Sequence, residues 1–331
     1  MSESRLPGLR KDHAGGTAGG RAGPFRAGTD GVDRLPHRNR CSAYRSVWEV
    51  FRTHGKRQAK RSPSLVRNWK RQLAHEPVVN SDETGYRTNG EKRWLWALVA
   101  PAFVFYKIAL TRGAEVLVQL LGEVFAGILC SDRCPSYLKY HKGEGQLCWA
   151  HFKRNILGVL EIAKTTEAER FCRDALALHA RLFRLWHRFR AGPGVRYGPV
   201  TREQLIAKSI PLEKKFFALA DRYAESDDKD VRNLAVALLT HFEKFFAFLR
   251  NEGVEPTNNS AERALRCAVQ WRKTSFGSRS AQGEIAVARL LTVTRTCRLQ
   301  NRQPLNYLGI AIRSHRKTLA APSLLKTTPT T

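Results

Sequence analysis

The stretch that decides the fold is PVVNSDETGY, residues 77–86. Its first part, Pro77 to Asp82, is a short apolar run that ends in a carboxylate, and we interpret it as a buried strand. Two more apolar runs follow at Arg93 to Ala100 and Phe103 to Leu110, both rich in Trp, Phe, Val and Tyr. Because only a short break separates these two runs, we predict that they form a hairpin.

The next segments alternate between helix and strand signals. Gly113 to Val124 has apolar side chains at helical spacing, and Ala126 to Ser131 is a further strand that ends at Asp132. The remaining elements of this region are a short helix over Pro135 to Tyr140, a strand around Gln146 to Trp149 and a helix from His151 to Lys164.

This order of elements predicts an α/β fold. Three antiparallel strands followed by a crossover into a parallel strand make a mixed sheet with helices on its faces, which is the ribonuclease H-like order. In that topology the first and fourth strands lie side by side. The carboxylates at their ends, Asp82 and Asp132, are therefore expected at the same edge of the sheet.

From Thr166 to Glu252 the pattern is helical throughout, and we interpret this part as a helical insertion. Another helix is expected to begin near Asn259, and a long one to cover Glu284 to Gln300. We predict that residues 1–75 form a basic region that is disordered or poorly structured apart from a short helix around Ser64 to Leu73. Residues 76–165 form the first part of the ribonuclease H-like core, and residues 166–253 form the helical insertion. Residues 254–321 form the second part of the core with the helix of Glu262, and residues 322–331 form a loose tail.

The charge balance of the chain is strongly basic. The sequence has 57 Lys+Arg against 29 Asp+Glu, a formal net charge of +28. Such an excess favours nucleic acid as the partner, although a ribosome-associated or merely basic surface protein has the same property. The basic residues 1–75 are either a DNA-gripping arm or a poorly selected or mis-assigned start.

The cysteines and the apolar runs indicate the compartment. Seven cysteines, an odd number, occur without a CxxC pair, so a disulfide framework or a four-cysteine zinc site is not expected and a reducing cytoplasm fits better. The N-terminus has no apolar core of a signal peptide. The longest apolar run, Leu95 to Tyr106, contains Pro101 and is too short to span a bilayer. We expect a cytoplasmic protein with no membrane partner.

Three carboxylates, Asp82, Asp132 and Glu262, fall at strand ends and on a helix. Hard oxygen ligands of this kind suit Mg²⁺ or Mn²⁺. Two such ions roughly 3.5–4 Å apart can stabilise both the attacking and the leaving oxygen of a phosphodiester displacement. We predict that Asp82 bridges two ions and that Asp132 and Glu262 each complete one site. Without metal, clustered carboxylates would repel one another.

Each of these carboxylates also has an ordinary structural interpretation. Asp82 precedes Glu-Thr-Gly, which is compatible with a turn, and Asp132 could cap the following helix. Glu262 lies three residues after Asn259, the spacing of a capping-box-like helix start. Local spacing alone decides nothing, and the surrounding sequence has to decide.

Six segments along the chain decide it. They are, in this order, NSDETGY (80–86), RGAEVL (112–117), FAGILCSD (125–132), CWAHFKR (148–154), NNSAERALR (258–266) and WRKTSFGS (271–278). From about Pro77 to about Ile312 this series closely resembles the transposases of the bacterial insertion sequence 66 family. Several motifs in the right order make the resemblance specific, unlike any single triplet.

The resemblance implies a DDE-type catalytic core whose acidic residues fall on Asp82, Asp132 and Glu262. It also implies a helical insertion between the second Asp and the Glu. By that likeness, metal-activated water would cut DNA at the transposon end and the freed 3′-OH would attack target DNA, without a covalent protein–DNA intermediate. It further implies a homo-oligomer in a synaptic complex, companion proteins of the same element, and a bacterial, nucleoid-associated location.

Two further groups of residues are candidates for the site. Cys148 and His151 resemble a C-x-x-H element of other insertion-bearing DDE enzymes; we favour a structural or DNA-orienting role for them and keep metal ligation as the alternative. The stretch after Glu262 is strongly basic, and its candidate DNA-contacting residues are Arg263, Arg266, Arg272, Lys273 and Arg279. Trp271 and Phe276, which are interleaved with them, would either stack on an unpaired base or belong to the core.

Residues 1–75 depart from the family pattern. Full-length members usually carry a coiled coil, a zinc-binding element and a helix-turn-helix region ahead of the core, whereas these residues show neither heptads nor paired cysteines. The end-recognition module is therefore expected to be missing or replaced. The leading hypothesis is an active transposase core that uses two Mg²⁺. The alternatives are a catalytically silent DNA-binding remnant and a ribonuclease H-like nuclease acting on RNA or branched DNA.

Overall fold

The computed structural model describes residues 63–191, 199–320 and 322–325. All of them belong to one compact unit, Val47–Thr331. The predictions for residues 1–62 therefore lie outside the described residues. Directly after them, helix α2 (Pro63–Ala74) occupies the place of the short helix expected around Ser64 to Leu73. Its Leu73 is fully buried, so this end of the basic region is folded onto the core.

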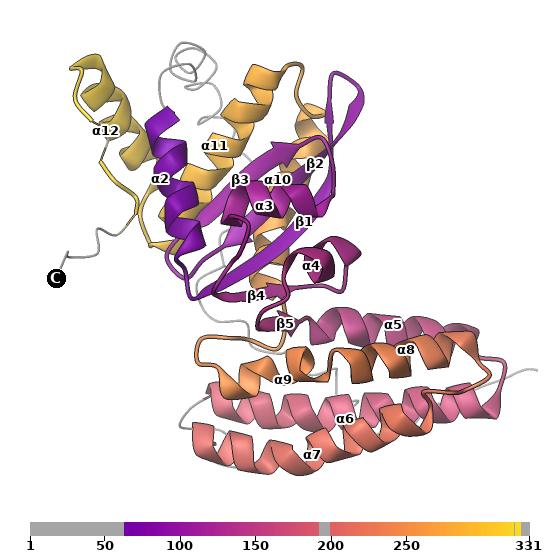
Figure 1. Ribbon diagram of the computed structural model, residues 1–331. Coiled ribbons are helices and arrows are strands. Elements are labelled where there is room, and N and C mark those ends of the chain that lie inside the picture. Colours follow the sequence, from indigo (N-terminus) through magenta and orange to yellow (C-terminus); the bar gives the residue numbers. More distant parts are fainter. Residues whose placement is uncertain (1–62, 192–198, 321, 326–331) are drawn as a thin grey trace, which may run out of the picture. The chain divides into compact units, whose positions relative to one another are not determined.

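Five strands form one mixed sheet. They are β1 (Val78–Thr88), β2 (Glu91–Val99), β3 (Val104–Ala109), β4 (Ile128–Ser131) and β5 (Gly145–Leu147). Their order across the sheet is β3-β2-β1-β4-β5 (Figure 1). The first three strands are antiparallel, whereas β4 runs parallel to β1 and β5 parallel to β4. The predicted α/β class, the hairpin and the adjacency of the first and fourth strands are confirmed.

The first strand is longer than expected. β1 continues past Asp82 to Thr88, and a two-residue turn at Asn89-Gly90 then leads into β2. Both turn residues have positive φ, 51° and 81°, which is the requirement of the turn that best matches the twist of a hairpin. Asp82 pairs with Ala97 in the middle of this ladder. Its interpretation as a strand-end or turn residue is therefore wrong.

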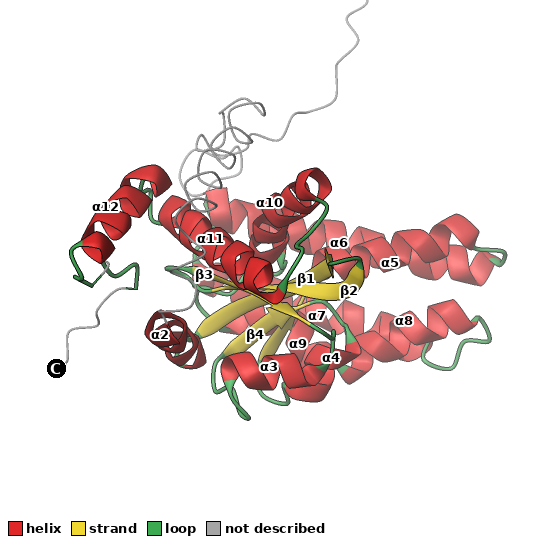
Figure 2. Cartoon of the chain, turned by 90° about the horizontal axis from the view of Figure 1, so that it is seen from above, coloured by secondary structure: helices red, strands yellow, loops and turns green. Residues whose placement is uncertain are grey.

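Helices cover both faces of the sheet. Figure 2 shows α10 and α11 on one side of the sheet and α3 and α4 on the other. These helices are α3 (Ala114–Leu121), α4 (Pro135–Tyr140), α10 (Asn259–Ser275) and α11 (Ala281–Leu299). All four were expected near these positions, whereas α12 (Pro304–Arg316), which follows α11, was not predicted.

Helix α11 also protects the open edge of the sheet. β3 is an edge strand, whose unpaired backbone groups would otherwise be exposed to pairing with another chain. The Thr296 hydroxyl accepts a hydrogen bond from the Val104 amide at 3.1 Å, and the Thr292 hydroxyl accepts one from the Tyr106 amide at 3.0 Å. Because the two threonines are four residues apart, they lie on one helix face and reach alternate residues of the strand.

The long helical part joins the opposite edge of the sheet. It comprises α5 (Trp149–Ile162), α6 (Thr166–Ala191), α7 (Arg202–Arg222), α8 (Lys229–Thr240) and α9 (Phe242–Arg250). Trp149 was expected in a strand but begins α5, because β5 already ends at Leu147. Its indole ring lies 5.0 Å from the Phe216 ring, and its Nε1 donates a 2.6 Å hydrogen bond to the Phe245 carbonyl. Trp149 thereby holds α5 against α7 and α9.

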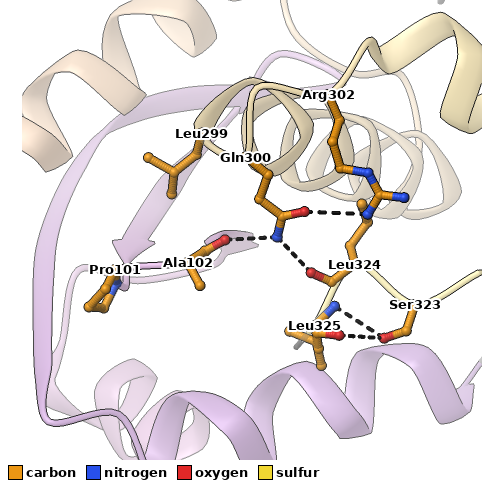
Figure 3. A pocket seen from close by; sticks show the side chains of 8 residues that line it. All are labelled: Pro101, Ala102, Leu299, Gln300, Arg302, Ser323, Leu324 and Leu325. Carbon is orange, nitrogen blue, oxygen red and sulfur yellow. Dashed lines mark hydrogen bonds between the residues drawn. The ribbon is translucent and has the colours of Figure 1, made fainter. Parts of the chain in front are cut away.

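The described end of the chain is held against the core. Gln300 donates from one amide nitrogen to the carbonyls of Ala102, at 2.9 Å, and Leu324, at 2.7 Å (Figure 3). Leu324 is buried, although residues 322–331 were expected to be loose. Residues 326–331 lie outside the described part of the chain.

Candidate active site

Asp82 is positioned by the alternation of β1. Successive side chains of a strand point to opposite faces, so Ser81 and Glu83 face α4 while Asp82 and Tyr86 face the α10–α11 side. Two contacts fix this assignment: the Tyr137 hydroxyl of α4 bonds to Glu83, and the Tyr86 hydroxyl lies 2.9 Å from the Ser278 hydroxyl.

Asp132 meets Asp82 at the end of the parallel ladder. The β1–β4 pairing ends at Asn80 and Cys130, and each aspartate lies two residues further along its strand direction. Asp132 Oδ1 accepts a 2.9 Å hydrogen bond from the Cys134 amide. Cys134 is itself the N-cap of α4, so Asp132 shapes the turn before the helix and its interpretation as a helix cap is wrong.

Glu262 lies in the first turn of α10. The N-cap is Asn258, whose side chain makes no capping hydrogen bond, and the Glu262 amide donates to the Asn258 carbonyl at 3.2 Å. The interpretation of Glu262 as the partner of a capping box with Asn259 is therefore wrong. Its side chain is 30% exposed, whereas Oε1 is a buried atom.

Asn258 connects this helix start to β1. The side chain of Asn258 is buried. It donates a 2.8 Å hydrogen bond to the Ser81 carbonyl and accepts a 3.1 Å hydrogen bond from the side-chain amide of Asn80. Asn258 was not predicted as a site residue. An asparagine ahead of a helix is typical of an ordinary cap, and only the tertiary contact reveals its different role.

The three carboxylates interact electrostatically. The pKa of Asp82 is raised to about 7, mainly because the side chain is desolvated by burial and then because of the negative charge of Glu83. The charges of Asp132 and Glu262 raise the pKa further, while the Glu83 amide, which donates to Asp82 Oδ1 at 2.9 Å, lowers it. A cation placed among these groups would relieve the repulsion and favour the ionised form.

Glu83 is a neighbour of this group with a different role. Its side chain is completely buried and forms an ion pair with Arg112 and a hydrogen bond with Tyr137. The Arg112 guanidinium also lies 5.1 Å from the centroid of the Trp94 ring. Glu83 therefore joins β1 to the segment before α3 and to α4, on the opposite face from Asp82.

Cys148 and His151 lie against Glu262. The Cys148 amide donates to the Ser131 carbonyl at 2.9 Å, and the Cys148 thiol accepts a 3.2 Å hydrogen bond from the Asn258 amide. His151 Nδ1 lies 3.5 Å from Glu262 Oε1. The Cys148, His151 and Glu262 ligand atoms all lie within 4.8 Å of one another, and within the described part of the chain no other group of three or more His, Cys, Asp or Glu residues does so.

Comparison with known proteins places the chain in a family. Residues 53–286 match the family model described as "Transposase IS66 family". The chain belongs to this family. The matched range begins before the expected start near Pro77 and ends within α11. It contains all six motifs together with the three carboxylates.

The curated relatives of this IS66-family chain are themselves uncharacterized. The chain is 26% identical to the "Uncharacterized protein y4qI" of Sinorhizobium fredii (strain NBRC 101917 / NGR234) over 66% of its own length and 43% of the relative. It is 26% identical to the "Uncharacterized protein y4hP" of the same strain, over 63% of its length and 40% of that protein. The chain thus spans less than half of the length of these two relatives.

The basic stretch of this IS66-family chain divides into two kinds of residue. Arg263, Arg266, Lys273 and Arg279 are exposed. Arg272, in contrast, is half-buried, and its guanidinium donates to the Gly85 carbonyl of β1. Arg272 therefore fastens α10 to the sheet, while the other four remain available to a polyanion.

Phe276 is displayed on the surface at the end of α10. It is 87% exposed and adopts the left-handed conformation at the helix C-cap. The next residues bind the tip of the β1–β2 hairpin: the Ser278 amide donates to the Arg87 carbonyl at 3.0 Å, and a Cβ on Gly277 would approach that carbonyl to 2.1 Å. The core interpretation is therefore wrong for Phe276, whereas Trp271 is half-buried.

No described helix is long and apolar enough to cross a membrane.

Proposed function

We propose that this IS66-family chain is a DDE-type transposase core with a ribonuclease H-like fold, which cleaves and joins DNA strands with divalent metal ions. Asp82, Asp132 and Glu262 would hold the metal. The observation that carries the proposal is the parallel pairing of β1 with β4, because Asp82 and Asp132 each lie two residues beyond its last pair. The pKa of the partly buried Asp82 is raised mainly by desolvation and by the charge of Glu83, and further by the charges of Asp132 and Glu262. Asp82, Asp132 and Glu262 come from three segments that are far apart in the sequence.

The donor set fits a hard cation. Three carboxylates offer only oxygen, which suits Mg²⁺ or Mn²⁺. The ligand atoms of Asp82, Asp132 and Glu262 do not gather as closely as those of Cys148, His151 and Glu262, which lie within 4.8 Å of one another. A site for two ions roughly 3.5–4 Å apart is wider than a site for one. When bound, such ions neutralise charge on the phosphodiester and make water or a 3′-OH a better nucleophile.

The residues around the carboxylates keep them in place. The Glu83 amide donates a hydrogen bond to Asp82 Oδ1, and the Cys134 amide donates one to Asp132 Oδ1. Asn258 fixes the start of the helix that carries Glu262. To join the two aspartates at a metal, Glu262 would have to turn its carboxylate away from His151, which is a side-chain rotation within the partly buried first turn of α10.

DNA is the proposed partner of the basic surface. The exposed Arg263, Arg266, Lys273 and Arg279 follow Glu262 along and beyond α10, so phosphates bound to them would lie beside the carboxylates. The proposal includes transposon ends and target DNA as substrates and a homo-oligomer in the synaptic complex, with companion proteins of the element as further partners.

A second candidate is a DNA-binding protein that does not cleave. The position of the Glu262 carboxylate favours it, because Oε1 lies 3.5 Å from His151 Nδ1 and not in a common group with the two aspartates. If that position is fixed, the third metal ligand is missing. The basic surface would still bind DNA.

Strand cleavage distinguishes the two candidates. A labelled duplex that carries the terminal repeat of the element is incubated with Mg²⁺ or Mn²⁺ and with wild type, Glu262→Gln or Glu161→Gln, the last being an exposed carboxylate of α5. The proposal expects metal-dependent cleavage that is lost in Glu262→Gln and kept in Glu161→Gln, with DNA binding unchanged in all three. Binding without cleavage by the wild type would instead support the silent protein.

A further inference from the structure

The cluster of Cys148, His151 and Glu262 differs chemically from the three carboxylates. It contains a thiol, an imidazole and a carboxylate, all within 4.8 Å of one another. Thiolate and imidazole ligands select Zn²⁺ and similar soft or borderline ions, whereas Mg²⁺ prefers oxygen alone. Three protein ligands with a fourth position left to water is a common arrangement of an open zinc site.

His151 and Glu262 each have one polar atom in this cluster that makes no hydrogen bond. His151 Nδ1 and Glu262 Oε1 are both buried atoms, and neither makes a hydrogen bond. Two buried atoms that make no hydrogen bond, 3.5 Å from each other and next to a thiol, therefore point to a ligand that contacts all three groups.

The backbone is arranged to favour a metal-bound thiolate at Cys148. Burial raises the pKa of the Cys148 thiol, and the negative charge of Glu262 raises it further. The Asn258 amide, however, donates a 3.2 Å hydrogen bond to the sulfur, and the backbone amides of Asn258, His151 and Ala150 lower the pKa. Such amides become stronger partners once the sulfur carries charge, and the cation supplies the remaining compensation.

We propose that Cys148, His151 and Glu262 form a Zn²⁺ site that shares Glu262 with the proposed catalytic set. On binding, a Zn–S bond replaces the S–H bond and the thiol proton passes to the solvent. Zn²⁺ at this place keeps the Glu262 carboxylate beside His151 and away from Asp82 and Asp132. The consequence for DNA cleavage rests on the proposed function: a chain loaded with Zn²⁺ would be held inactive until the ion leaves.

The position of the cluster gives this exchange a structural basis. Cys148 and His151 are the N-cap and a first-turn residue of α5, three positions apart and therefore on one helix face. Glu262 is in the first turn of α10. One ion would thus join the start of the helical insertion to the helix that carries the proposed third catalytic carboxylate.

Zinc binding can be tested on the full chain without DNA. Metal-free protein is titrated with Co²⁺, whose thiolate charge-transfer and tetrahedral absorption bands report its ligands, and Zn²⁺ is then added to displace it. The proposal expects one such site per chain, abolished by Cys148→Ser and by His151→Ala. Loss of a residue that only hydrogen-bonds to a metal ligand lowers metal affinity by roughly 10–100-fold. In Glu262→Gln, which removes a proposed ligand, the affinity for Co²⁺ should fall by at least that much.

Cys172→Ser is the matched control, because Cys172 is also a fully buried free thiol but lies in α6. It should bind Co²⁺ like the wild type, and circular dichroism of each variant shows whether it has folded. Absence of the charge-transfer band in the wild type, or its survival in folded Cys148→Ser, overturns the site. Wild-type affinity in Glu262→Gln overturns the sharing of Glu262.

A second measurement connects the site to cleavage. With the wild type in Mg²⁺, one equivalent of Zn²⁺ should stop strand cleavage, and a chelator selective for Zn²⁺ should restore it. Full cleavage with Zn²⁺ bound overturns the inhibitory role. Failure to cleave in Mg²⁺ alone counts against the proposed function, and the Co²⁺ titration still decides the metal site independently.

Discussion

The side-chain amide of Asn258 donates a 2.8 Å hydrogen bond to the backbone carbonyl of Ser81, the residue directly before Asp82. This bond joins the start of α10 to the middle of β1. Both groups are buried, so the bond is not exchanged with solvent and fixes the distance between the two backbones. The same helix start carries Glu262, and the geometry of the proposed metal site therefore depends on one side chain outside the carboxylate set.

We predict that Asn258→Ala impairs cleavage more than stability. The change leaves the Ser81 carbonyl and the Asn80 amide without their partner, which costs about 1–3 kcal/mol of unfolding free energy. It also frees the start of α10, so strand cleavage should fall by more than the folded fraction does. Urea denaturation and the cleavage assay measure the two effects. The control is Asn251→Ala, which removes a 3.2 Å side-chain bond to the Ala247 carbonyl that stays within the end of α9. Equal cleavage by the two variants would contradict the prediction.

The pKa of Asp82 gives a second prediction, for the metal-free protein. Its pKa of about 7 in the folded chain lies above the ordinary value of 3.8, so between these pH values the folded chain holds a proton that the unfolded chain has lost. The stability from protonated Asp82 is present below the lower value and is lost as the pH rises through the higher one. Asp82→Asn should remove this loss. In the presence of a chelator, its melting temperature relative to wild type should be higher at pH 8 than at pH 5. A pH-independent difference would show that the carboxyl is not perturbed.

Metal binding should have the opposite pH dependence. A metal must displace the proton of Asp82, so the ionised form that is unfavourable alone becomes favourable with a cation. Mg²⁺ should therefore raise the melting temperature of the wild type more at pH 8 than at pH 6. In Glu262→Gln and Asp132→Asn the increase should be smaller at both pH values. Thermal denaturation with and without Mg²⁺ measures it, and an equal increase in all three proteins would exclude these residues as ligands.

The sequence predicts the elements of this fold better than their limits. Helix and strand periodicities are local, and the order of elements therefore follows from residues 77–164 alone. The extension of β1 beyond Asp82 was not predicted, although Asn89-Gly90 is a strong hairpin signal. The composition of the segment Asp82-Glu83-Thr84-Gly85 is compatible with a turn, whereas its pairing with β2 keeps it extended.

The candidate site shows the same limit more sharply. The motif order identifies the three carboxylates as candidates, but the direction of the Glu262 side chain depends on where α5 begins relative to α10. That position is set by the Cys148 thiol and the Asn258 amide, 110 residues apart in sequence. Contacts of this kind leave no local pattern, so neither the role of Asn258 nor the contact of His151 with Glu262 was predicted.

The basic residues of α10 should separate into two classes on mutation. Arg266 is exposed, so Arg266→Ala should leave stability unchanged and weaken DNA binding uniformly across sequences, lowering the salt slope by about 1 for one lost phosphate contact. Arg272→Ala should instead lower stability, because its guanidinium donates to the Gly85 carbonyl. Binding isotherms at several salt concentrations and urea denaturation distinguish them. The assignment of Arg266 fails if its variant shows an unchanged salt slope.

Phe276 is expected to contact an unpaired base. It is 87% exposed at the end of the basic helix, and the Gly277–Ser278 contacts with the hairpin tip hold its backbone in a fixed, left-handed conformation. An aromatic side chain held in this way offers a stacking face at little entropic cost, and stacking on a base is worth about 1–3 kcal/mol. Phe276→Ala should therefore weaken binding to a duplex with a single-stranded overhang by about that amount while leaving a blunt duplex and the melting temperature nearly unchanged. Phe217→Ala, which removes a half-exposed phenylalanine of α7, should affect neither duplex. If Phe276→Ala weakens both duplexes equally, the aromatic ring contacts the backbone or supports the loop, and base stacking is excluded.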